Sequence, residues 1–187
     1  MKEFKFVCRV CGHNSYRRMY DIYVCERCSV LFLDEAMFSL PVVKYKKLHP
    51  DAIPPKKAKP GDVGYDVFAL NDYILPPLTT VMLETGLSVE LPPNTEIQVR
   101  PRSGLALKES IMVVNSPGTI DTGYRGPCNV LLMKVANTET QYYPIKKGDK
   151  IAQFLVTTKL PYVFEEELGE LSSTDRGVKG FGSTGKN

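Results

Sequence analysis

The stretch from residue 79 to residue 102, TTVMLETGLSVELPPNTEIQVRPR, consists of short runs of β-branched and apolar residues interrupted by turn residues such as PPNT. Runs of this kind predict β-strands. Further runs of the same type lie on both sides of it: PVVKYKKL, GYDVFAL, YILPPL, IMVVNSP, NVLLMKVAN and DKIAQFLVT. Many short strands favour a sandwich, jelly roll or barrel over a parallel α/β sheet. The predicted fold class is therefore all-β, with one helical turn in SGLALKES after Arg102.

Composition and charge limit the classes of function. The chain has 187 residues, of which 43% are hydrophobic and 24% charged, as in an ordinary soluble globular protein. No apolar run approaches the roughly 20 residues of a membrane helix, and the start, MKEFKFVCRVCG, lacks the apolar core of a secretion signal. We therefore expect a cytoplasmic protein with no membrane partner. Its net charge of +3 is too small to imply nucleic-acid binding by itself.

The cysteines divide the chain unevenly. Four of the five lie in the first thirty residues, and Cys128 lies alone far downstream. We predict a cysteine module over residues 1–34, a linker over 35–42 and the β domain over 43–171. The last segment, 172–187, is rich in Gly, Ser, Thr and Lys, and we expect it to be a flexible arm.

The four N-terminal cysteines form two pairs of Cys-x-x-Cys spacing: Cys8 with Cys11, and Cys25 with Cys28. Two such turns can direct four thiolates at one tetrahedral centre, which is how ribbon modules hold Zn²⁺. The alternatives are four unrelated cysteines and a rubredoxin-like iron site. Because sulfur would fill every position, we predict a structural metal and not a catalytic one.

The cysteine module also carries basic and aromatic residues, which suggests a docking role. Arginine can contact phosphates and tyrosine can stack on bases, so the module is a candidate for binding nucleic acid or a protein. A solvated basic face explains the same residues equally well, namely Arg9, Arg17, Arg18, Arg27, Tyr16, Tyr20 and Tyr23.

Two polar stretches of the β domain suit a nucleoside phosphate. Arg102, Ser103 and Gly104 combine a guanidinium, a hydroxyl and an unhindered amide, which together can hold phosphate oxygens. The tail sequence GFGSTG at 180–185 adds two hydroxyls, a flexible backbone and an aromatic ring. Either stretch alone is more often an ordinary loop.

Asp121 lies in NSPGTIDTGYRG, a glycine-containing stretch that we expect to form a hairpin. A carboxylate in this position can orient and deprotonate a water molecule. Taken alone, it is better explained as a turn aspartate bonded to its own backbone.

Together, five stretches resemble in order and spacing the five motifs of the trimeric deoxyuridine triphosphatase (dUTPase) family. They are PGDVGYD, PRSGLALK, NSPGTIDTGYRG, KGDKIAQ and RGVKGFGSTG, and the resemblance covers the chain after Pro41. In the first motif, Asp62 and Val63 replace the small residues usual in the family. The resemblance implies a jelly-roll β-barrel for this part of the chain, beside the small N-terminal ribbon.

The resemblance also implies residue roles in hydrolysing dUTP to dUMP and pyrophosphate. Asp121 matches the general base that activates water for attack on the α-phosphorus. Asn115 matches the hairpin that reads uracil, together with the backbone of Gly118, Thr119 and Ile120. Tyr124 matches the ring that stacks below the deoxyribose.

The remaining matches concern the phosphates and the closing arm. Asp66 matches an acid that supports the metal-water and arginine network. The others match phosphate contacts or the arm that covers uracil: Arg102, Ser103, Gly104, Gln153, Arg176, Phe181, Gly182, Ser183 and Thr184.

The family pattern further implies Mg²⁺ held through the substrate's phosphates, and a homotrimer whose arms close over neighbouring sites. Two other functions remain open on this scaffold, namely a dCTP deaminase and a non-catalytic regulatory binding protein. The intact NSPGTIDTGYRG hairpin and the aromatic tail argue against the deaminase. We assign no role to Cys128.

Overall fold

The computed structural model describes residue 8 and residues 15–19, 22–29, 31–32, 41–135 and 142–178. This part of the chain contains fourteen strands and one short helix, α1 (Ser103–Glu109), so the all-β prediction is confirmed. The helix coincides with the predicted SGLALKES turn. No helix within these residues is long and apolar enough to cross a membrane.

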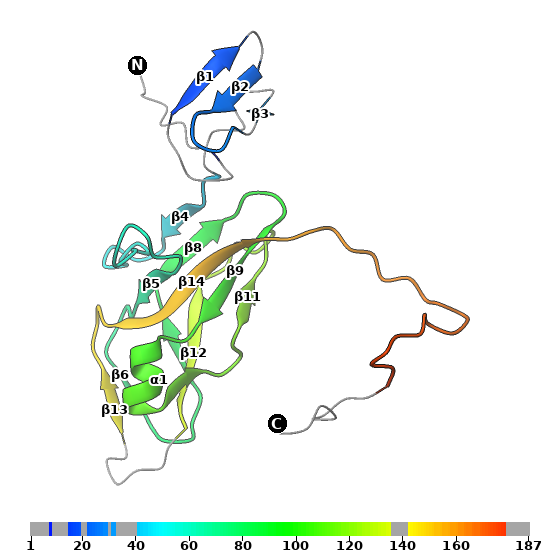
Figure 1. Cartoon of the computed structure of the whole chain (residues 1–187). Helices are drawn as coiled ribbons and strands as arrows, with labels where there is room; N and C mark the ends of the chain where they lie inside the picture. Colours follow the sequence, from blue (N-terminus) through cyan, green and yellow to red (C-terminus); the bar gives the residue numbers. More distant parts are fainter. Residues whose placement is uncertain are drawn as a thin grey trace.

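Two sheets form the body of the main domain (Figure 1). One consists, in spatial order, of β11 (Gly118–Ile120), β9 (Thr95–Arg100), β14 (Lys150–Thr158) and β5 (Tyr65–Phe68). The other has the order β10-β12-β7, with bounds Ile111–Val113, Asn129–Lys134 and Val81–Glu84. Two strand pairs complete the domain, β4 (Lys44–Lys47) with β8 (Leu87–Glu90) and β6 (Tyr73–Leu75) with β13 (Tyr143–Ile145).

The core lies between these sheets because their strands alternate buried and less buried residues. In β9 the side chains of Thr95, Ile97 and Val99 are buried, while those between them are partly exposed. The strand β12 shows the same period of two, which is the pattern of a sheet with one face on the core. The buried cluster joins both sheets and includes Val67, Leu83, Ile97, Val99, Leu132 and Phe154.

The quoted run TTVMLETGLSVEL forms two strands and not one. Gly86 separates β7 from β8 with a φ of +69°, a conformation that glycine adopts without strain. A Cβ at this position would also lie 2.9 Å from the Cβ of Ala52. The turn sends β7 to pair with β12, and β8 to pair with β4.

The N-terminal module is a three-stranded sheet of order β1-β2-β3, with bounds Tyr16–Met19, Ile22–Cys25 and Leu31–Phe32. The strands β1 and β2 form a hairpin, in which Tyr16 pairs with Cys25. The rings of Tyr16 and Tyr23 meet edge to face with centroids 5.4 Å apart. Figure 1 shows this small sheet as a body of its own next to β4.

Beyond β14, residues 159–178 run away from the barrel as an exposed arm (Figure 1). Several apolar side chains of the arm have no cover, and Phe164 is completely exposed. Exposed apolar residues that gather in one segment commonly mark an interaction surface.

Candidate active site and metal centre

A charged cluster lies on one side of the first sheet, around Asp66 of β5. Asp66 is only 2% exposed. Its Oδ2 lies 2.7 Å from Nζ of Lys150, and Gln153 donates a hydrogen bond from Nε2 to its Oδ1 at 3.1 Å. The Nε of Arg102 lies 3.5 Å from the same Oδ1. Three residues assigned to the phosphate network, Asp66, Arg102 and Gln153, therefore lie together in one chain.

The surroundings of Asp66 decide its charge. Burial disfavours the ionised carboxylate, and this is the largest single effect on its pKa. The hydrogen bonds from Lys150 and Gln153, with the positive charges of Lys150 and Arg102, outweigh burial together and hold the pKa of Asp66 below its ordinary value. Asp66 is therefore an anion at neutral pH, which anchors Arg102 at the surface.

The residues Arg102, Ser103 and Gly104 begin helix α1. Arg102 is the N-terminal flanking residue, with extended backbone angles, and its Nη1 donates to the carbonyl oxygen of Lys150 at 3.1 Å. Ser103 and Gly104 are exposed, and a Cβ at Gly104 would meet open space. The predicted phosphate-binding residues thus face solvent at one end of the sheet.

The predicted uracil-reading hairpin connects the two sheets. β10 pairs with β12, whereas β11 pairs with β9, so the segment 114–117 crosses from one sheet to the other. The peptide bond between Ser116 and Pro117 is cis. A Cβ at Gly118 would lie 2.9 Å from Nδ2 of Asn115. The absence of a side chain at Gly118 therefore allows the Asn115 amide to pack over the strand.

Asp121 follows β11 directly and is exposed. Among the residues that the structure describes, none donates to its carboxylate or forms an ion pair with it. The backbone NH of Tyr124 donates to the carbonyl oxygen of Asp121 at 3.0 Å, which closes the turn. The hydroxyl of Thr122 donates to the carbonyl oxygen of Thr95 and fixes the turn to β9. The Asp121 side chain is thus free to contact water or substrate.

The ring of Tyr124 also has a defined position after this turn. Its hydroxyl donates to the carbonyl oxygen of Pro127 at 3.0 Å, and 44% of the residue remains exposed. A side chain at Gly126 would collide with this ring. The turn therefore presents a largely fixed aromatic face.

Within one chain, Asp121 and the Asp66 cluster do not meet. On β9, Gly118 pairs with Val99 and Gln153 pairs with Arg100. Counting along the strands from these two pairs, Asp121 and Gln153 lie four positions apart, and they are two strands apart across the sheet. With a rise of about 3.3 Å per residue and a strand spacing of about 4.8 Å, the separation is on the order of 15 Å. In a single chain, Asp121 and the Asp66 cluster are therefore too far apart to contact the same phosphate group.

Arg176 lies in the exposed arm. The other arm residues predicted to contact substrate, namely Phe181, Gly182, Ser183 and Thr184, lie outside the described residues.

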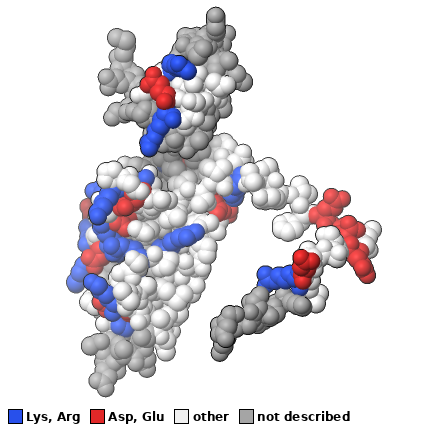
Figure 2. Space-filling view, viewed as in Figure 1, with Lys and Arg blue, Asp and Glu red and all other residues white. Residues whose placement is uncertain are grey.

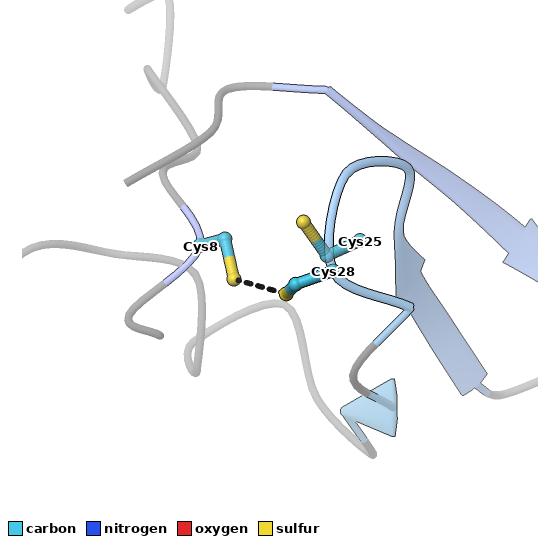
Figure 3. Close-up of side chains that lie close together, drawn as sticks. All are labelled: Cys8, Cys25 and Cys28. Atoms are coloured by element: carbon cyan, nitrogen blue, oxygen red, sulfur yellow. Dashed lines mark hydrogen bonds between the residues drawn. The ribbon is translucent and has the colours of Figure 1, made fainter. Parts of the chain in front are cut away.

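Three cysteines of the N-terminal module lie close together. The sulfur atoms of Cys8, Cys25 and Cys28 are all within 4.8 Å of one another, and those of Cys8 and Cys28 are 3.6 Å apart (Figure 3). A disulfide would need about 2.05 Å, whereas sulfurs bound tetrahedrally at about 2.3 Å from Zn²⁺ are about 3.8 Å apart. The spacing therefore fits a shared metal ion. Cys11, the fourth predicted ligand, lies outside the described residues.

Sequence reasoning missed Lys150 as a member of the site. It stands within the quoted KGDKIAQ motif, but the sequence does not show that its amine meets Asp66. The remaining cysteine, Cys128, is buried, and burial raises the pKa of its thiol to about 11. A neutral buried thiol agrees with a packing role.

Comparison with known proteins gives consistent matches for the main domain. The dUTPase family model matches residues 51–185. A deoxyuridine 5′-triphosphate nucleotidohydrolase of Clostridioides difficile is 46% identical over 143 residues, which cover 76% of this chain and 97% of that protein. The enzyme of the same name from Clostridium acetobutylicum is 48% identical over 143 residues, covering 76% of this chain and 96% of that protein.

Solved structures share the fold of the main domain. The dUTPase of Staphylococcus bacteriophage 80alpha with dUpNHpp superposes with a TM-score of 0.71 at 24% identity, covering 77% of this chain and 98% of that one. A mutant dUTPase from phage phi11 of S. aureus, which coordinates a structural Mg(II) ion, has a TM-score of 0.57 at 21% identity, covering 71% of this chain and 97% of that one.

Proposed function

This chain belongs to the dUTPase family, and we propose that it hydrolyses dUTP to dUMP and pyrophosphate. The observation that carries this proposal is the exposed Asp121 carboxylate directly after β11, to which no residue in the described part of the chain donates a hydrogen bond. A carboxylate in this setting can accept a proton from water as the water attacks the α-phosphorus. The identity to named nucleotidohydrolases supports the same activity.

Selection of the base and the sugar is assigned to the hairpin and the turn that follows it. Asn115 and the backbone of Gly118, Thr119 and Ile120 would read the edge of uracil and leave no space for a 5-methyl group. Tyr124, supported by its bond to Pro127, would exclude a ribose 2′-hydroxyl by contact. Rejection by a shaped wall gives strong discrimination because the wrong ligand clashes.

Binding of the phosphates is assigned to the start of α1 and to β14. Arg102, Ser103, Gly104 and Gln153 offer donors that can bind phosphate oxygens, and Asp66 holds two of these residues in place. The arm would complete the site with further contacts from Arg176, Phe181, Gly182, Ser183 and Thr184.

The residues present fit a Mg²⁺ ion that is bound through the substrate. Asp66 is already engaged by Lys150 and Gln153, and among the described residues the only group of three potential ligands is the cysteine cluster. Mg²⁺ commonly binds phosphates with few protein ligands, and it would neutralise charge on the phosphate chain.

A homotrimer with shared sites accounts for the separation between Asp121 and the Asp66 cluster. The arm supports this assembly because it carries exposed apolar residues and a run of acids, Glu165, Glu166 and Glu167, which Figure 2 shows as a red segment away from the barrel. A partner chain would cover these side chains. We propose that residues 172–187, the C-terminal part of this exposed segment, close the site.

For residues 1–34 we propose a structural Zn²⁺ site formed by Cys8, Cys11, Cys25 and Cys28, joined to the enzyme by a linker over 35–42. The sulfur spacing of the three described cysteines supports it. Zinc would stabilise a module whose own apolar core is small. Cysteines that are not joined in disulfides fit the reducing conditions of the cytoplasm. The exposed Arg17 and Arg27 support docking of nucleic acid or protein as an added role.

Product analysis tests the activity. The purified protein with Mg²⁺ should release dUMP and pyrophosphate from dUTP, and should leave dTTP and UTP nearly unchanged. Asp121→Asn should lower kcat by about 10³-fold, since it removes the base while substrate still binds. Ammonia released from dCTP, or a wild-type rate in Asp121→Asn, would contradict the proposal.

A further inference from the structure

The strand β14 contains an irregularity at its start, beside Asp66. Gln153 pairs with Asp66 and Ala152 with Val67, but the next pair joins Lys150 to Phe68. One extra residue, Ile151, is therefore accommodated on β14, which is the definition of a β-bulge.

The bulge changes the face on which Lys150 lies. In a regular strand, side chains alternate, so Lys150 would share the buried face with Ala152 and Phe154. Instead Ile151 and Ala152 are both buried, and Lys150, like Gln153, is only partly buried. Lys150 and Gln153 are three positions apart in sequence and both contact the Asp66 carboxylate.

Lys150 holds two groups of the site at once. Its amine lies 2.7 Å from Oδ2 of Asp66, and its carbonyl oxygen accepts a hydrogen bond from Nη1 of Arg102 at 3.1 Å. We infer that Lys150, turned outward by the bulge, is a positioning residue that fixes the Asp66 carboxylate and the Arg102 guanidinium for phosphate binding. This inference rests on the proposed hydrolysis of dUTP.

The charges around Asp66 explain why one lysine matters. In the described part of the chain, the groups that face its carboxylate are Lys150 and Gln153 from β14 and Arg102 from the start of α1. Lys56 joins Asp66 only through backbone hydrogen bonds. Without Lys150, only the hydrogen bond from Gln153 and the Arg102 charge at 3.5 Å remain to oppose the effect of burial, so the pKa of Asp66 rises. A protonated Asp66 then loses its ion pair with Arg102.

The test compares Lys150→Met with Lys150→Arg in the full-length protein. We expect Lys150→Met to lower kcat/KM for dUTP by about 10- to 100-fold, as misplaced contacts commonly do, with a larger loss at lower pH because the pKa of Asp66 is raised. Lys150→Arg should recover most of the rate, because it restores a cation beside Asp66. Lys146→Met is the matched control, since its amine pairs with Asp72 at the surface.

The outcomes separate this inference from the proposed function. If wild-type protein fails to hydrolyse dUTP, the proposed function fails, and binding of dUpNHpp by calorimetry at pH 6 and pH 8 then decides the role of Lys150. If wild type is active but Lys150→Met keeps the wild-type pH profile, only the role of Lys150 is overturned. An equal loss at every pH that Lys150→Arg does not rescue also overturns it, because that pattern reports a general packing defect. Should Lys150→Met not fold, Lys150→Gln provides the same comparison.

Discussion

At the scale of single residues, the geometry of the hairpin depends on the lack of a side chain at Gly118. Gly118 leaves room for the amide of Asn115, which would lie 2.9 Å from a Cβ at that position. Contacts closer than about 3 Å force the neighbour to move, so a Cβ at position 118 would displace the exposed Asn115 side chain. Under the proposed role of Asn115 in reading the base, recognition depends on glycine at position 118.

We predict that Gly118→Ala raises KM for dUTP by about tenfold with a smaller change in kcat, since it weakens binding of the base and not the attack by water. Steady-state kinetics measure both constants. Gly61→Ala is the control, because a Cβ at Gly61 meets no atom within 4 Å. A wild-type KM in Gly118→Ala would remove the Asn115 amide from base recognition.

The roles of single residues could be predicted from the sequence only because the motifs around them form a recognisable set. Asp121 by itself resembles a turn aspartate, and its turn contacts agree with that view. Lys150 could not be predicted, because strand alternation places it in the core and only a bulge brings it to Asp66. An extra residue in a strand leaves little trace in a hydrophobic pattern.

At the scale of elements, short runs of β-branched and apolar residues between turn residues located most strands of the main domain correctly. The turn at Gly86 was the main difference, since a single apolar run concealed two strands that belong to different strand pairings. The strand β13 was not predicted. It is three residues long and contains Pro144, which weakens any strand signal.

The N-terminal module provides a prediction at this scale. Wild-type protein should carry about one Zn²⁺ per chain, as a four-sulfur site requires, and Cys25→Ser should lose it. Because the metal holds only this small sheet, hydrolysis of dUTP should persist in the variant. Elemental analysis and kinetics on the same sample measure both effects.

Cys128→Ala provides the control for that experiment, because Cys128 is a buried thiol of the main domain. It should retain the zinc. Iron in place of zinc, or full zinc content in Cys25→Ser, would contradict the proposed site.

At the scale of the whole molecule, the sequence could not show that Asp121 and the Asp66 cluster lie apart within one chain. Sheet order reveals it, because β9 and β14 lie between Asp121 and Asp66. The family resemblance implied shared sites, and the distances within one chain supply a physical reason for them.

Subunit mixing tests this arrangement. Asp121→Asn and Arg102→Ala should each be nearly inactive as pure proteins. After unfolding and joint refolding, some sites should combine an intact Asp121 from one chain with an intact Arg102 from another. With random mixing, about a quarter of the wild-type activity should return. Activity that stays at the level of the separate variants would show that both residues act from the same chain.

The position of β14 also determines when the barrel can form. This strand is the last of the barrel in sequence, yet it lies between β9 and β5, and it joins Gln153 to Asp66 across 87 positions. Long-range pairings of this kind slow folding. During synthesis, the edges of β9 and β5 that pair with β14 therefore stay unpaired until nearly the whole chain has left the ribosome. The N-terminal sheet, whose pairings are local, can form long before that moment.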